Sequence, residues 1–60
     1  MLTKEQKKEA EEELVSLVKS EGPEADYSDL SDQLEGMLPP EQLEYAIANW
    51  DEILKKHGVL

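Results

Sequence analysis

Ten carboxylates and no lysine or arginine occupy the stretch from Ser20 to Leu54. Four of these acids recur at every third position: Asp26, Asp29, Asp32 and Glu35. On a helix, each such step turns by about 300° and rises about 4.5 Å, so the four side chains wind across one face. Phosphates along a nucleic-acid strand repeat at a comparable spacing, about 3.4 Å. Two interpretations stay open: a row of charge that imitates phosphates, or an ordinary solvated face.

The same acids do not fit a calcium-binding loop of the EF-hand type. A loop that began at Asp26 would need an oxygen ligand at position 30, glycine at 31 and glutamate at 37. The chain has Leu30, Ser31 and Met37 at those positions. Because the chain also has no cysteine and only one histidine, the sequence predicts no metal site and no cofactor.

The groups needed for catalysis are also missing from the sequence. His57 stands near the end of a predicted helix, where a cation suits the negative end of the helix dipole. It has no cysteine partner, and no serine stands in a nucleophile-elbow pattern. We expect the carboxylates to be exposed, with ordinary acidity, and a chain this short to lack a substrate cleft. The sequence therefore predicts that the protein is not an enzyme.

Length and charge limit the number of domains, the stability and the location that the sequence predicts. Sixty residues with a net charge of −9 predict a single domain spanning positions 1–60, with marginal stability because short chains bury only about 60% of their surface. No apolar run approaches the roughly 18 residues that span a bilayer, and the start of the chain does not resemble a signal peptide. Acidic faces also disfavour nucleic acid and anionic lipid. We therefore expect a cytoplasmic protein that binds neither directly.

Helix signals divide the chain into three predicted helices. The first runs from about position 3 to 21, with Thr3 and Gln6 spaced as a capping box, and Gly22-Pro23 ends it. Its first half, Lys4 to Glu13, is almost wholly polar, so we expect that half to project past the core or to fray. The second runs from about Ser28 to Glu35, capped by Asp26 or Ser28, with Gly36 as a left-handed exit.

The third predicted helix begins at Pro39-Pro40-Glu41 and continues to the lysines near the end of the chain. Its apolar stripe consists of Leu43, Ile47, Trp50 and Leu54, widened by Ala46 and Ile53. Gly58 and Val59 suit a Schellman motif at its end.

These elements predict an all-α fold: a small antiparallel three-helix bundle with a long, partly projecting first helix. Its predicted core consists of Leu14, Leu17, Val18, Leu30, Leu34, Leu38, Leu43, Ile47, Trp50 and Leu54.

The leading functional hypothesis is a small acidic protein-binding module. Tyr45 falls nearly opposite the apolar stripe of the third helix, so it is an exposed aromatic, a contact with the first helix, or the anchor of an acidic binding face. The predicted partner-binding residues are Asp26, Asp29, Asp32, Glu35, Glu41, Tyr45, Asn49 and Glu52. In its most concrete form the protein is a stoichiometric inhibitor that mimics nucleic acid and occupies the basic surface of a larger, nucleic-acid-binding protein.

The alternative hypothesis is a structural or adaptor module whose acidity only maintains solubility. Such a module would bind through an apolar groove or self-associate, with little dependence on salt. We expect a monomer or a weak homodimer under either hypothesis.

Overall fold

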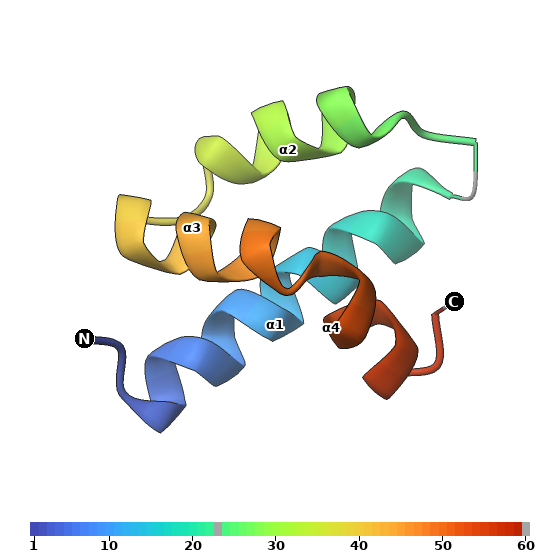
Figure 1. Ribbon diagram of the computed structural model, residues 1–60. Helices are drawn as coiled ribbons and strands as arrows, with labels where there is room; N and C mark the ends of the chain where they lie inside the picture. Colours follow the sequence, from blue (N-terminus) through green and yellow to red (C-terminus); the bar gives the residue numbers. More distant parts are fainter. Residues whose placement is uncertain (23, 60) are drawn as a thin grey trace.

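The computed structural model describes residues 1–22 and 24–59. Within these residues the chain forms four helices and no strand: α1 (Lys4–Glu21), α2 (Tyr27–Glu35), α3 (Pro40–Ala48) and α4 (Trp50–Lys56). The all-α class and the long first helix are confirmed (Figure 1). The prediction of three helices is wrong, because α3 and α4 replace the single third helix. Pro23, which was predicted to end the first helix together with Gly22, lies outside the described residues.

The local sequence patterns predicted both ends of α1 correctly. The Gln6 amide donates to Thr3 Oγ1 at 3.1 Å, and the Thr3 amide donates to Gln6 Oε1 at 2.9 Å, which completes the predicted capping box. At the other end Gly22 adopts a φ of 87°, and its amide donates to the Val18 carbonyl at 2.9 Å. Glycine adopts this positive φ without the steric cost that a Cβ would bring.

The first half of α1 does not project past the core as predicted. Ala10 is fully buried and Glu11 is 9% exposed. Gln42 on α3 is buried as well, and its Nε2 donates to the Gln6 carbonyl at 2.8 Å. Hydrogen bonds as well as apolar contacts therefore attach this half of α1 to α3, while Lys4 to Glu9 stay exposed.

The connection between α2 and α3 differs in detail from its prediction. Asp26 is the N-cap of α2, although its side chain makes no capping hydrogen bond. Leu30 and Leu34 are buried, as their spacing indicates. Gly36 has a φ of −79°, in the right-handed helical region, so the predicted left-handed exit is wrong. The chain continues in nearly helical turns, and the Leu38 amide donates to the Leu34 carbonyl at 3.0 Å.

Asn49 separates α3 from α4. Its φ of −116° and ψ of 23° leave the helical region, and both its backbone amide and its side-chain Nδ2 donate to the Tyr45 carbonyl. Helix α4 then begins at once, with Asn49 as its N-cap residue. Asparagine favours such helix ends because its side chain competes for backbone hydrogen bonds.

The side chains that face the core differ from those predicted for the third helix. Ile47, predicted to be core, is 38% exposed, and Leu43, Trp50 and Val18 are only partly buried. The observed core consists of Ala10, Leu14, Val15, Leu17, Leu30, Leu34, Leu38, Ala46, Ile53 and Leu54. On α3 the buried side chains are Gln42 and Ala46 in place of Leu43 and Ile47, so this helix faces the core with a different side from the one predicted.

The end of α4 forms the predicted Schellman motif. The Gly58 amide donates to the Lys55 carbonyl at 3.1 Å, and the Val59 amide donates to the Leu54 carbonyl at 2.8 Å. Gly58 has a φ of 72°, and Val59 packs against the core. In the part of the chain that the structure describes, no helix combines the length and the apolar character needed to cross a bilayer.

Candidate binding site

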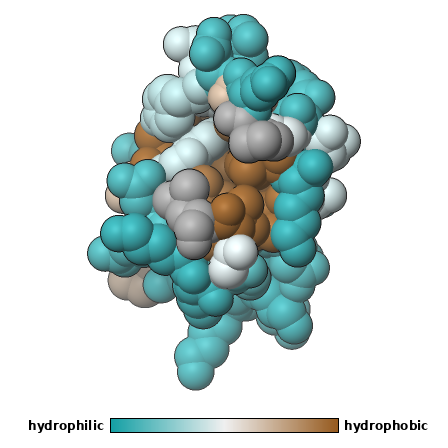
Figure 2. Space-filling model, turned by 90° about the vertical axis from the view of Figure 1, so that its right-hand side faces the viewer, coloured by the Kyte–Doolittle hydropathy of each residue, from teal (hydrophilic) through white to brown (hydrophobic). Residues whose placement is uncertain are grey.

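An apolar hollow opens between the end of α1, the start of α2 and α4. Helices α2 and α4 each pack on α1 and α3, but their backbones do not pack on each other (Figure 1). The hollow has a volume of about 390 Å³. It is lined by Val18, Lys19, Gly22, Ala25, Tyr27, Leu30, Trp50, Leu54 and Val59. Figure 2 shows apolar side chains at its bottom, framed by hydrophilic ones.

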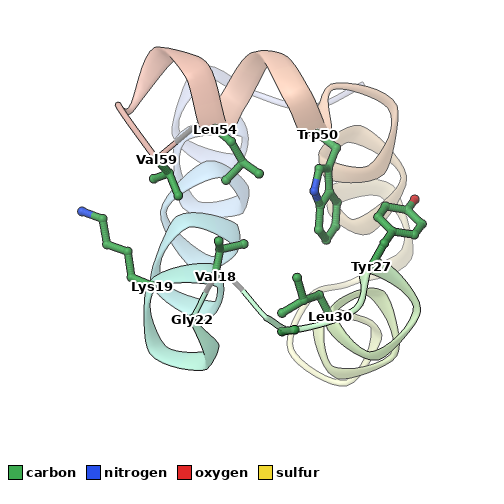
Figure 3. Close-up of a pocket in the computed structure, with 9 residues that line it drawn as sticks. Val18, Lys19, Gly22, Tyr27, Leu30, Trp50, Leu54 and Val59 are labelled. Carbon is green, nitrogen blue, oxygen red and sulfur yellow. The ribbon is translucent and has the colours of Figure 1, made fainter.

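The close-up of the hollow shows how its walls are arranged. Leu54 and Val59 point toward Val18, and the Trp50 ring points toward α2 (Figure 3). The ammonium group of Lys19 points away from the apolar space (Figure 3). The interior therefore offers mainly hydrocarbon and aromatic surface, which is typical of sites that take up an apolar group.

Tyr27 and Trp50 form one wall of the hollow. Their ring centroids lie 4.7 Å apart with an interplanar angle of 64°, an edge-to-face arrangement. Tyr27 is the first residue of α2 and Trp50 the first residue of α4, so the ring pair bridges the two helices. Tyr27 is 52% exposed, and Trp50 is half-buried against the core. The predicted central core position of Trp50 is therefore wrong, because the ring lies at the edge of the core.

A second, shallower hollow also borders the aromatic pair. That hollow is lined by Tyr27, Ile47, Ala48, Asn49, Trp50, Asp51 and Glu52. The carboxylates of Asp51 and Glu52 are exposed there, beside the partly exposed Ile47. We call the two hollows together the Tyr27–Trp50 site. It combines apolar surface with flanking negative charge.

The predicted partner-binding residues do not gather on one surface. The four acids at every third position are all exposed: Asp26 at the N-cap of α2, and Asp29, Asp32 and Glu35 on the helix itself. Asn49 and Glu52 line the shallow hollow. Glu41 lies elsewhere, at the start of α3, where its carboxylate is 3.9 Å from the Met1 amino group. Their role in binding stays a prediction.

Tyr45 faces α1 and is not a free anchor. Its hydroxyl donates to Glu11 Oε2 at 2.8 Å, and its ring packs against the core. Of the alternatives left open for Tyr45, the contact with the first helix is confirmed, and the isolated exposed aromatic is wrong. This hydrogen bond, burial and the charges of Glu11 and Glu52 raise the pKa of the Tyr45 phenol.

Glu11 is a buried carboxylate that the sequence interpretation missed. Besides Tyr45, it contacts Lys56 Nζ at 3.3 Å and His57 Nε2 at 3.1 Å, both through Oε1. Burial is the largest single effect and raises the pKa of Glu11. The three hydrogen bonds and the Lys56 charge act the other way and together hold that pKa below its ordinary value of 4.5. The expectation of ordinary acidity for every carboxylate is therefore wrong at this position.

Among the described residues, no group of three or more histidine, aspartate or glutamate side chains is arranged to hold a metal ion. Comparison with known proteins adds no assignment: no protein-family model, curated protein or solved structure matches this chain. The site must therefore be interpreted from its own chemistry.

Proposed function

We propose that this protein is a small acidic binding module that recognises a basic protein segment carrying one large apolar side chain. The observation that supports this proposal best is the Tyr27–Trp50 site, an open apolar hollow in a chain of net charge −9. The apolar side chain would enter the hollow, and the basic residues around it would face the carboxylates of α2 and α4.

Each part of the site would contribute in a different way. Burying one large apolar side chain contributes about 1.5–3 kcal/mol. Exposed carboxylates such as Asp51 and Glu52 contribute less to affinity, but they accelerate encounter with a basic partner and disfavour acidic ones. The combination favours a partner with both properties over one that has only one of them.

The most concrete form of this function is inhibition. Basic segments with interspersed apolar residues occur on surfaces that bind nucleic acid, and the exposed acids of α2 would occupy such a surface in place of phosphates. In this role the protein is a stoichiometric binder and not a catalyst.

The second candidate function is an adaptor that binds through apolar contact alone. The hollow itself favours this candidate, because an apolar cavity of about 390 Å³ needs no charge to accept a side chain. The two candidates differ in how strongly binding depends on the carboxylates.

Selection of peptides from a random library against the immobilised protein tests the proposal. We expect the selected peptides to carry lysine or arginine around one large apolar residue. Tyr27→Ala should weaken their binding by about 2 kcal/mol or more, roughly thirtyfold, because it removes an exposed wall of the site.

Met37→Ala is the matched control for this selection. Met37 is 45% exposed, similar to Tyr27, but it lies beside the α2–α3 turn, outside the Tyr27–Trp50 site. We expect this variant to bind the peptides like the parent. Peptides without basic residues, or equal losses in both variants, would contradict the proposal.

A further inference from the structure

Four of the six lysines of this acidic protein gather around one hollow, on a surface separate from the Tyr27–Trp50 site. The hollow has a volume of about 400 Å³ and is lined by Lys4, Lys7, Lys8, Glu11, Tyr45, Lys56 and His57. Four lysines and one glutamate give this lining a charge of +3. The remaining two lysines and fourteen carboxylates carry −12, so the chain total is −9. The charge of the molecule is therefore strongly segregated.

The fold brings these lysines together from the two ends of the sequence. Lys4, Lys7, Lys8 and Glu11 have spacings of three, four and seven residues, which place them on one face of α1. Lys56 is the last residue of α4, and His57 follows it. Because α4 packs on α1, the end of α4 reaches the lysine-bearing face of α1.

Glu11 and Tyr45 form the inner wall of the lysine hollow. Both carboxylate oxygens of Glu11 already have partners: Oε2 accepts from Tyr45, and Oε1 contacts Lys56 and His57. The one negative group of the lining is thus engaged within the fold. Lys7 Nζ lies 5.8 Å from the centre of the Tyr45 ring, within the range of a cation–π contact.

The ammonium groups around the hollow remain accessible. The Lys8 side chain is 78% exposed and the Lys56 side chain 69% exposed. Lys8 has one surface neighbour of opposite charge, Glu12 at 4.0 Å, which is itself exposed and contributes little. A hollow of this size suits a small ligand, and lysine binds phosphate groups as a point charge.

We propose that the lysine hollow binds a phosphate group, with Lys4, Lys7, Lys8 and Lys56 supplying the positive charge. The phosphate belongs either to the free ion or to a small phosphomonoester. In the second case, the Tyr45 ring and the lysine methylenes would contact the group that carries the phosphate. This site is independent of the proposed protein-binding function, because it uses none of the residues of the Tyr27–Trp50 site.

Titration of the folded protein with inorganic phosphate and with phenyl phosphate, followed by NMR at constant ionic strength, tests this inference. We expect saturable shifts of the Tyr45 and His57 ring resonances. Tighter binding of phenyl phosphate would assign the site to phosphomonoesters, and equal binding would assign it to the free ion. Shifts that stay linear in ligand concentration would overturn the proposal.

Two double variants with the same net charge distinguish phosphate binding at the lysine hollow from a general effect of the protein's charge. Lys4→Gln with Lys7→Gln should weaken binding about fivefold, which corresponds to about 0.5 kcal/mol for each exposed charge. Lys19→Gln with Lys55→Gln, outside the hollow, should leave it unchanged. Equal weakening by the two double variants would contradict a specific site. Shifts that depend on protein concentration without phosphate would instead assign the hollow to an acidic surface of a second copy.

Discussion

Ile53→Ala should lower the free energy of unfolding by about 2–4 kcal/mol, whereas Ile47→Ala should lower it by less than about 1 kcal/mol. The two isoleucines were predicted to lie on the apolar side of one helix. In the structure Ile53 is 3% exposed and Ile47 is 38% exposed. Truncation at Ile53 removes buried methyl groups and leaves a cavity, but at Ile47 solvent already reaches the side chain. Chemical denaturation of the two variants measures the difference.

This pair of variants tests directly which side of α3 and α4 faces the core, because the substitution is the same at both positions. A chain of this length is expected to have a total stability of about 3–9 kcal/mol, so the loss at Ile53 is a large fraction of the whole. A greater loss at Ile47 than at Ile53 would mean that one continuous helix, with the predicted rotation, replaces α3 and α4.

Glu11→Ala should destabilise the fold by about 2–3 kcal/mol, far more than Glu12→Ala on the same helix. Glu11 joins α1 to α3 through Tyr45 and to α4 through Lys56 and His57. A hydrogen bond to a charged group contributes about 1.5–3 kcal/mol, and the contacts with Lys56 and His57 add less because those side chains reach solvent. The Glu11 side chain is 12% exposed and that of Glu12 is 60% exposed, so only the first is shielded from water. Thermal denaturation of both variants should separate them clearly, and equal melting temperatures would contradict this role of Glu11.

The Glu11 contacts also predict a dependence on pH. The pKa of Glu11 is lower in the folded chain than its ordinary value of 4.5. Its contribution is therefore complete above about pH 4.5 and is lost as the pH falls through the folded pKa. Stability should decline in this acidic range for the parent and more gradually for Glu11→Ala. A parallel decline in both proteins would show that other carboxylates are responsible.

Features that depend on a few neighbouring residues could be predicted from the sequence. The capping box at Thr3 and Gln6 and the Schellman motif at Gly58 and Val59 are local patterns, and both are present. The break at Asn49 could not be predicted in the same way, because the apolar spacing continues through it. The hydrogen bond between Tyr45 and Glu11 joins residues 34 positions apart, and no local pattern predicts such a pair.

Of the candidate site, only the negative charge could be predicted from the sequence. The exposure of the α2 acids follows from their spacing opposite Leu30 and Leu34. The apolar hollow, in contrast, lies where α2 and α4 pack on α1 and touch each other only through side chains, which depends on the relative placement of whole helices. The sequence offered only the two aromatic residues themselves, Tyr27 and Trp50, because their positions at the starts of α2 and α4 were not predicted.

The most direct test of the proposed function is the affinity of a selected basic peptide at low and at high salt, followed by the fluorescence of Trp50. We expect binding to weaken as salt screens the charges, and to weaken less in Asp51→Asn with Glu52→Gln than in the parent. Glu9→Gln with Glu13→Gln, which removes the same charge from exposed positions on α1, should keep the salt dependence of the parent. An affinity that is the same at low and high salt would contradict recognition of a basic segment and would favour the apolar adaptor instead.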